Sequence, residues 1–151
     1  MTELYKNYIN GEWVEGNSVT VNINPSDTND IIGNYTRATK AQTEEAITSA
    51  KNAFASWSRT TPQERYEILK KASDEILARK DDLGRLLSRE EGKTLPEGIG
   101  EATRAGQIFA FFAGEALRLN GEMVPSIRPG VGIEITREAV GVIGMITPWN
   151  F

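Results

Sequence analysis

The chain has 151 residues, of which 39% are hydrophobic and 25% charged, and it carries a net charge of −4. This composition predicts one soluble domain with a real core, and the interspersed charges indicate no binding surface for nucleic acid or an anionic membrane. The absence of cysteine and histidine excludes, within these residues, disulfides, thiolate nucleophiles and Ser-His-Asp triads, and no metal site is expected.

The first 35 residues predict a small antiparallel β region. They lack the apolar core of a signal peptide, and no apolar stretch of the chain is long enough to cross a bilayer, so we expect a cytoplasmic protein without a membrane partner. At residues 8–14 the dipeptide Asn10-Gly11 separates two apolar pairs, which predicts a hairpin with a type I′ turn. Apolar and polar residues alternate at 19–23, and residues 31–35 suggest another short strand.

Capping patterns predict two helices next. Thr39 and Gln42 fit a capping box, and Thr61, Pro62 and Glu64 are the residue types that satisfy or remove unpaired N–H groups at a helix start. The expected buried faces are Ala46, Ile47, Ala50, Phe54 and Trp57 in the first helix and Tyr66, Leu69, Ala72, Ile76 and Leu77 in the second.

Two further helices are expected before residue 121. The third begins near Asp81, turns Leu83, Leu86 and Leu87 inward and ends at Gly92. The fourth runs from Pro96 to a terminator at residues 120–121, and its alanines and glycines favour the close approach of another element. The charged residues at 89–93, 97 and 101 are expected to form a solvated helix face.

Arg104 has two interpretations. It shares a helical stripe with Ile108, Phe111 and Glu115, which would set a guanidinium beside apolar groups. The simpler interpretation is an exposed i, i+3 ion pair with Glu101, which contributes little to stability. Helix geometry alone favours the simpler interpretation.

The last third of the chain returns to strand patterns. Residues 123–127 and 131–135 flank a Pro129-Gly130 turn, and an apolar run at 140–146 predicts a strand buried on both faces of a parallel sheet. Such a strand needs a sheet and covering helices, so the chain is expected to be the front of a larger protein. Beyond the strand end, the Asn150 amide would be placed to stabilise an oxyanion, although spacing alone favours an arbitrary turn.

Six motifs in order resemble the N-terminal part of the NAD(P)-dependent aldehyde dehydrogenase superfamily. The resemblance covers essentially the whole chain, and the last motif is highly specific. The motifs are NGEW at 10–13, NPS at 24–26, EGKT at 91–94, FFAG at 111–114, REAVGV at 137–142 and TPWNF at 147–151.

The resemblance implies an α/β fold, the N-terminal portion of an aldehyde dehydrogenase with a Rossmann-like coenzyme domain and a β-hairpin oligomerisation arm, truncated at the first buried parallel strand. Residues 1–121 would belong to the coenzyme-binding domain, residues 122–139 would form the arm, and residues 140–151 would be the first strand and loop of the Rossmann-like core. A homo-oligomer, dimer or tetramer, would assemble through the arm.

The resemblance also implies site residues. Asn150 would be the catalytic oxyanion donor, and Phe151, Arg104 and Phe111 would contact the aldehyde substrate. The pattern KTLPE at 93–97, followed by Glu101 and Arg104, is most similar to 2-oxoglutarate and succinate semialdehyde enzymes, so Arg104 is expected to pair with the far carboxylate of a semialdehyde. The nicotinamide half of NAD or NADP would lie along Ile146, Thr147, Pro148 and Trp149.

The chain departs from the family in lacking the catalytic cysteine, the downstream glycine-rich cofactor turn with its lysine, and the catalytic glutamate. By itself it is therefore expected to be inactive and to bind NAD weakly or not at all. The alternative is a catalytically dead remnant that serves as an interaction module through its arm.

Overall fold

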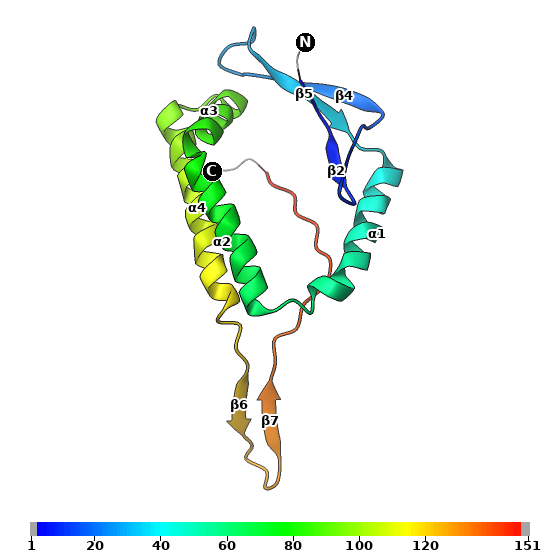
Figure 1. Ribbon diagram of the computed structural model, residues 1–151, viewed down its shortest axis with the longest axis vertical. Helices are drawn as coiled ribbons and strands as arrows, with labels where there is room; N and C mark the ends of the chain where they lie inside the picture. The colour runs from blue at the N-terminus through cyan, green and yellow to red at the C-terminus, as the bar shows by residue number, and fades with distance from the viewer. Residues whose placement is uncertain (1–2, 149–151) are drawn as a thin grey trace.

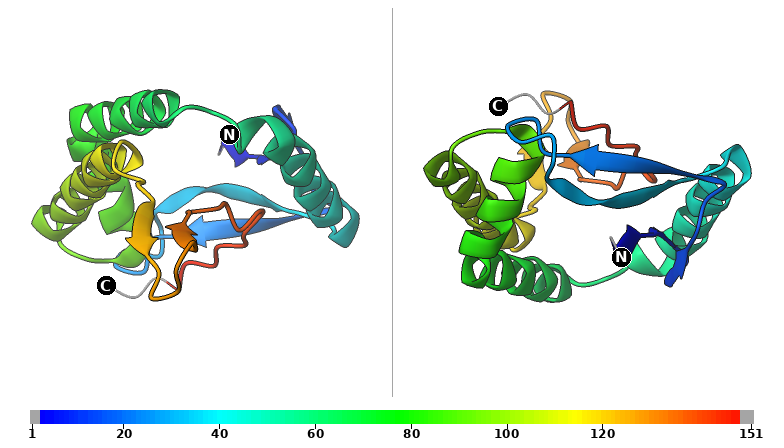
Figure 2. Two further views of the ribbon diagram at one scale, coloured as in Figure 1. Left: turned by 90° about the horizontal axis from the view of Figure 1, so that it is seen from below. Right: turned by 90° about the horizontal axis from the view of Figure 1, so that it is seen from above.

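The computed structural model describes residues 3–148. Within them, seven short strands and four helices form an α/β structure. The strands of the N-terminal half lie at one end, with α1 (Lys40–Trp57) below them on one side. The other three helices stand together on the opposite side, and a hairpin projects from the far end (Figure 1). In the views along the long axis, α1 also lies apart from the other three helices (Figure 2).

The N-terminal strands form two small sheets. The expected hairpin is confirmed in β2 (Asn7–Ile9) and β3 (Glu12–Val14), where Asn10 has φ 52° and Gly11 φ 85°, the positive values that a type I′ turn needs. The strands β4 (Ser18–Ile23) and β5 (Ile31–Arg37) pair antiparallel as expected. The prediction of a purely antiparallel region is wrong for β1 (Leu4–Tyr5), which pairs parallel to β5 and is too short to leave a pattern.

Two of the four helices, α1 and α2, begin where their capping residues predict, and the other two begin one residue before the expected starts at Asp81 and Pro96. Both predicted capping boxes are present, at Thr39 and Thr61, and Gly92 ends a helix with φ 74°. The expected helix end at residues 120–121 is wrong, because Leu117 and Arg118 already donate to carbonyls three residues back, a tighter turn that closes the helix. The remaining helices are α2 (Pro62–Ala78), α3 (Lys80–Glu91) and α4 (Leu95–Ala116).

Small residues let α2, α3 and α4 pack with their backbones close together. A Cβ atom added to Gly84 of α3 would lie 2.5 Å from the Cα atom of Ile99 in α4, and one added to Gly106 would lie 2.6 Å from Leu77 Cγ in α2. The Ser73 hydroxyl, 1% exposed, donates to the Gly106 carbonyl at 2.8 Å. The close approach expected along the fourth helix is therefore confirmed. Among residues 3–148 the buried apolar side chains are Ile9, Ile32, Ala102, Ala113 and Ala116.

The apolar face predicted for α1 is not buried. Ile47 is 55% exposed and Trp57 48% exposed, and the structure, which describes all of α1, buries no residue of this helix. The helix is instead held at its edge by polar contacts: Ser49 Oγ donates to Asn10 Oδ1 at 3.0 Å, and Gln42 Nε2 to the Glu15 carbonyl at 2.7 Å. The described elements thus leave the apolar side of α1 uncovered. The inward position expected for Leu86 is likewise wrong, since this side chain is 37% exposed.

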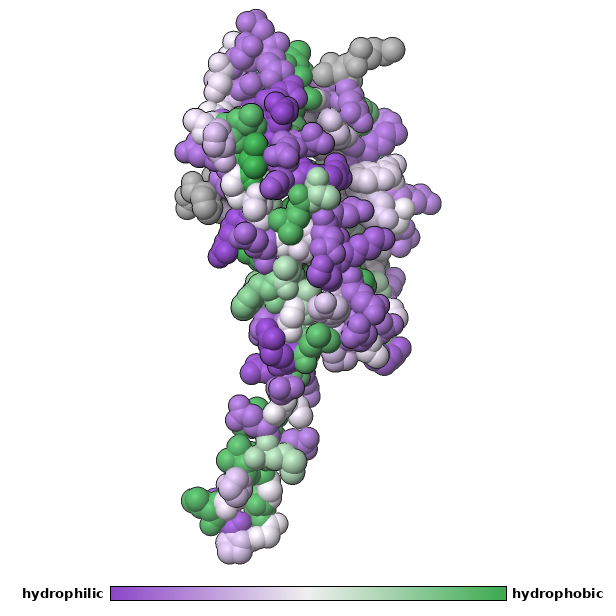
Figure 3. Space-filling model, turned by 60° about the vertical axis from the view of Figure 1, so that its left-hand side comes forward, coloured by the Kyte–Doolittle hydropathy of each residue, from purple (hydrophilic) through white to green (hydrophobic). Residues whose placement is uncertain are grey.

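A second hairpin follows α4. Its strands β6 (Glu122–Pro125) and β7 (Gly132–Ile135) pair antiparallel, with Val124 opposite Ile133, and Gly130 in the turn has φ 76°. In the space-filling view it stands out from the body and carries apolar surface (Figure 3). The strand pair expected around Pro129-Gly130 is therefore confirmed.

The buried parallel strand expected at 140–146 is wrong for the described chain. Residues 138–148 contain no strand, and they run back from the hairpin between the α1 side and the α2–α4 side (Figure 1). Val140 is 90% exposed, Met145 83% and Ile146 96%. A strand forms by hydrogen-bonding to a neighbour, and none of the described strands pairs with this segment, so its β-favouring residues have no ladder to join.

Candidate functional site

A pocket of about 400 Å³ lies where the loop after α3 meets the first turns of α4. Among residues 3–148 its lining is charged apart from one glycine, so it can attract a charged ligand group. The lining residues are Lys93, Glu97, Gly100, Glu101 and Arg104.

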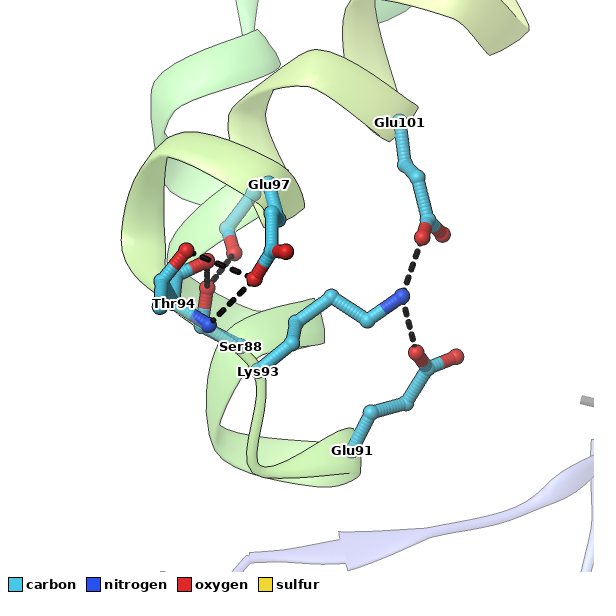
Figure 4. A network of polar contacts seen from close by, with 7 residues as sticks. Ser88, Glu91, Lys93, Thr94, Glu97 and Glu101 are labelled. Atoms are coloured by element: carbon cyan, nitrogen blue, oxygen red, sulfur yellow. Dashed lines mark hydrogen bonds and ion pairs between the residues drawn. The ribbon is translucent and has the colours of Figure 1, made fainter. Parts of the chain in front are cut away.

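Lys93 lies between two carboxylates. Its Nζ contacts Glu91 at the end of α3 and Glu101 in the second turn of α4 (Figure 4). The three side chains are only 16% to 20% exposed, so the solvated face expected here is wrong. Contact with Glu101, and to a smaller degree with Glu91, raises the pKa of the Lys93 amine above its ordinary value, which keeps the amine charged.

Glu97, which also lines the pocket, caps the N-terminus of α4. Its Oε2 accepts from the Thr94 backbone N–H at 3.0 Å and from the Thr94 hydroxyl at 2.7 Å (Figure 4). These hydrogen bonds lower the pKa of Glu97 and hold its carboxylate against the helix N-terminus. This capping box was not among the expected helix starts, although the spacing Thr94-x-x-Glu97 predicts it.

Arg104 is exposed on α4 and faces the same pocket. The ion pair expected with Glu101 is not formed, because Glu101 contacts Lys93. In the part of the chain that the structure describes, no hydrogen bond or ion pair holds the Arg104 guanidinium. Phe111, two turns further along α4, is 60% exposed and stacks edge-on with Phe112, 5.3 Å between ring centroids. A cation and exposed aromatic rings thus occur along one helix.

The C-terminal end of α3 is fixed to the N-terminal sheet by side chains. Arg89 donates to both carboxylate oxygens of Asp30, at 2.8 and 2.6 Å, and this contact, helped by Asn24, lowers the pKa of Asp30 to about 2. Glu90 Oε1 accepts from Asn22 Nδ2 at 2.9 Å and from the Tyr35 hydroxyl at 3.2 Å. Since Lys93 follows directly, these contacts position the loop that carries it.

The cofactor residues expected at the C-terminal end are not brought to this pocket. Ile146, Thr147 and Pro148 lie in the exposed segment without regular structure, and they are not among the described residues that line the pocket around Arg104. The expected positions of Trp149, Asn150 and Phe151 lie outside the described residues.

Residues 3–148 contain neither a metal-binding cluster nor a membrane-spanning helix. No group of three or more acidic side chains is arranged to hold a metal ion. None of the described helices has the length and apolar character needed to span a bilayer.

Comparison with protein families identifies one that matches most of the chain. The sequence profile of the aldehyde dehydrogenase family matches residues 13–151. An α-ketoglutaric semialdehyde dehydrogenase of Bacillus subtilis is 41% identical over 97% of this chain, and a mitochondrial succinate-semialdehyde dehydrogenase of Arabidopsis thaliana is 36% identical over 95%. The chain spans 30% and 27% of the lengths of these relatives.

Solved structures give the same result. A betaine aldehyde dehydrogenase of Staphylococcus aureus in complex with NAD+ superimposes with a TM-score of 0.82 and 34% identity, over 88% of this chain and 27% of that one. An aldehyde dehydrogenase of Brucella melitensis biovar abortus superimposes with a TM-score of 0.79 and 32% identity, over 83% of this chain and 26% of its own length. The described residues thus have part of the fold of these enzymes.

Proposed function

The chain belongs to the aldehyde dehydrogenase family, and on this basis we propose that it acts within a complete enzyme that oxidises a carboxylate-bearing semialdehyde to the acid with NAD+ or NADP+. The names of relatives support this substrate class, since they include α-ketoglutaric, succinate and glutarate semialdehyde dehydrogenases. The structural observation that carries it is the Arg104 guanidinium, which faces a pocket and has no partner within residues 3–148.

Arg104 would bind the carboxylate at the far end of the substrate. A guanidinium offers a planar pair of N–H donors that matches a carboxylate, and a charge-assisted contact of this kind contributes about 1.5–3 kcal/mol. Phe111, seven residues further along α4, would lie against the aliphatic part of the substrate. A neutral aldehyde would gain nothing from Arg104, so the contact would set substrate preference.

The C-terminal motif would serve the reacting end of the substrate. The Asn150 side-chain amide would donate to the oxyanion that develops at the aldehyde carbon, and Phe151 would line the path of the aldehyde. Ile146, Thr147, Pro148 and Trp149 would lie along the nicotinamide half of the cofactor. The other cofactor and catalytic groups would come from outside these 151 residues, so the isolated chain stays predicted to be inactive and to bind NAD weakly or not at all.

The substrate class is tested by replacing Arg104 with methionine in the complete enzyme. We expect kcat/KM for succinate semialdehyde to fall about 10- to 100-fold, since the charge-assisted contact is lost. Butanal, which has the same carbon count but no carboxylate, should be oxidised as before. Arg118→Met is the matched control, because Arg118 pairs with Glu115 after the end of α4 and does not line the pocket. An unchanged preference for the semialdehyde in Arg104→Met would contradict the proposal.

A second candidate function is an interaction module without catalysis. The observation that favours it is the β6–β7 hairpin, which projects from the body and exposes Met123 by 89% and Ile127 fully. If the chain acts within a complete enzyme, the same hairpin, within residues 122–139, would be the oligomerisation arm. Failure of the complete protein to oxidise any aldehyde with NAD+ or NADP+ would favour the second candidate.

A further inference from the structure

Among the described residues, two carboxylates line the pocket around Arg104, and each is engaged by another group. Glu97 accepts from the backbone and hydroxyl of Thr94, and Glu101 contacts Lys93. Arg104 therefore keeps its positive charge uncompensated within residues 3–148, even though two acids line the same pocket. The absence of an ion pair between Arg104 and Glu101 needs an explanation, because opposite charges three residues apart on a helix can pair.

Glu101 and Arg104 are three residues apart on α4, the spacing at which side chains of one helix face meet. A free Glu101 carboxylate would lie within reach of the Arg104 guanidinium and would compete with any external carboxylate. Whatever holds Glu101 away thus decides whether Arg104 can bind an anion.

Lys93 holds Glu101 from the loop before the helix. Gly92, with φ 74°, reverses the chain after α3, and the Lys93 side chain then extends toward α4, where its amine lies between Glu91 and Glu101 (Figure 4). Glu91 supplies a second contact on the opposite side of the amine, which fixes its position. Because the amine and both carboxylates are mostly buried, solvent screens this group less than an exposed pair.

We propose that Lys93 is a positioning residue for substrate selection: by holding Glu101, it leaves the Arg104 guanidinium available to the carboxylate of the semialdehyde. The proposal rests on the proposed function of Arg104 and adds a second residue to it. Lys93 itself does not touch the substrate in this scheme and acts only through Glu101.

A double-mutant cycle in the complete enzyme tests this role. Lys93→Met frees Glu101 to pair with Arg104, so KM for succinate semialdehyde should rise about fivefold while kcat stays unchanged. Adding Glu101→Gln removes the competing carboxylate, and the double variant should return to the KM of Glu101→Gln alone. If Lys93→Met raised KM by the same factor with and without Glu101→Gln, Lys93 would act directly on the substrate and the proposal would fail.

Three further measurements separate positioning from general damage. Lys93→Arg keeps a cation able to hold Glu101 and should keep the normal KM. Lys93→Met combined with Glu91→Gln removes the other carboxylate partner, which is not on α4, and should leave KM raised. KM for butanal should be the same in all variants. A rise in KM for butanal in Lys93→Met would indicate a purely structural role and would overturn the proposal.

The outcomes distinguish this inference from the proposed function. If Arg104→Met abolishes the preference for the semialdehyde and Lys93→Met leaves KM unchanged, the function of Arg104 stands and the role of Lys93 is rejected. If Arg104→Met has no effect on the preference, the substrate assignment fails first, and the role of Lys93 fails with it.

Discussion

The helical unit of α2, α3 and α4 and the C-terminal region at residues 119–148 differ in what they bury: the helical unit buries small residues, and the C-terminal region buries none of its residues. In the helical unit, glycines and alanines bring backbones into contact, and Ala113 is fully buried. In the C-terminal region, β-branched and other large apolar side chains are exposed, up to 96% at Ile146 and completely at Ile127.

The difference follows from where backbone hydrogen bonds are made. A helix satisfies its N–H and C=O groups within one segment, so packing on neighbouring helices only has to bury one face. A strand satisfies them on another strand. The β6–β7 hairpin carries its own partner and forms, whereas residues 138–148 have none among the described strands and remain irregular. Strand propensity therefore needs a partner before it becomes structure.

The largest expected loss of stability comes from a substitution that disrupts the packing of the helical unit. Gly84→Ala places a Cβ atom 2.5 Å from the Ile99 Cα atom, a backbone contact that cannot move aside, so we expect a loss of at least about 3 kcal/mol in the free energy of unfolding. Urea unfolding followed by helical circular dichroism measures it.

Gly100→Ala is the matched control for this change. It makes the same substitution inside a helix, but nothing lies within 4 Å of the added Cβ atom. It should raise stability by about 0.5–1 kcal/mol, because alanine is the better helix former. Equal effects of the two substitutions would show that close helix contact does not limit stability.

Much of this fold could be predicted from local residues alone. The Asn10-Gly11 turn and the caps at Thr39 and Thr61 depend on neighbours two or three positions away, and all three are confirmed. The exposure of α1 and the irregular segment at 138–148 could not be predicted, because burial depends on which elements lie nearby. Apolar periodicity identifies a face that can be buried and does not say what covers it.

The candidate site was predictable in part. Arg104 is a site residue that the family resemblance implies, and in the structure it lines a pocket. Its freedom from Glu101 was not predictable, because Lys93 reaches Glu101 across the turn at Gly92, and that path depends on a positive φ angle and on the crossing of α3 and α4. The contacts of Arg89 and Glu90 with the N-terminal sheet join residues more than fifty positions apart and leave no local pattern.

A smaller change in stability is expected from the ion pair between Asp30 and Arg89, which joins the helical unit to the N-terminal sheet. The pKa of Asp30 is lowered from 3.8 to about 2, first by Arg89 and then by Asn24, so folding favours the charged carboxylate. The stabilisation from this pair should be complete above pH 4 and should disappear as the pH falls through about 2.

Asp30→Asn tests the direction of this pH dependence of stability. The variant should be less stable than the original chain at pH 5, and the difference should shrink to nothing near pH 2, as measured by urea unfolding at each pH. Asp27→Asn is the control, since Asp27 lies in the same loop and accepts from the Asn29 backbone without contacting Arg89. A difference that persists unchanged to pH 2 would assign the effect of Asp30 to something other than its charge.

The smallest effect is expected in the C-terminal region, and it separates the two regions most directly. Ile146→Thr should change the stability of this chain by less than about 0.5 kcal/mol, because the side chain is 96% exposed and contributes no buried area. Ile32→Thr, the same substitution at an 8% exposed position in β5, should cost about 2 kcal/mol.

In the complete enzyme the two costs should become similar, because the apolar run at 140–146 would then have a sheet to join and Ile146 would be covered. A cost for Ile146→Thr that stays near zero in the complete enzyme would mean that this run is exposed there too, and that its apolar residues serve a surface instead of a core.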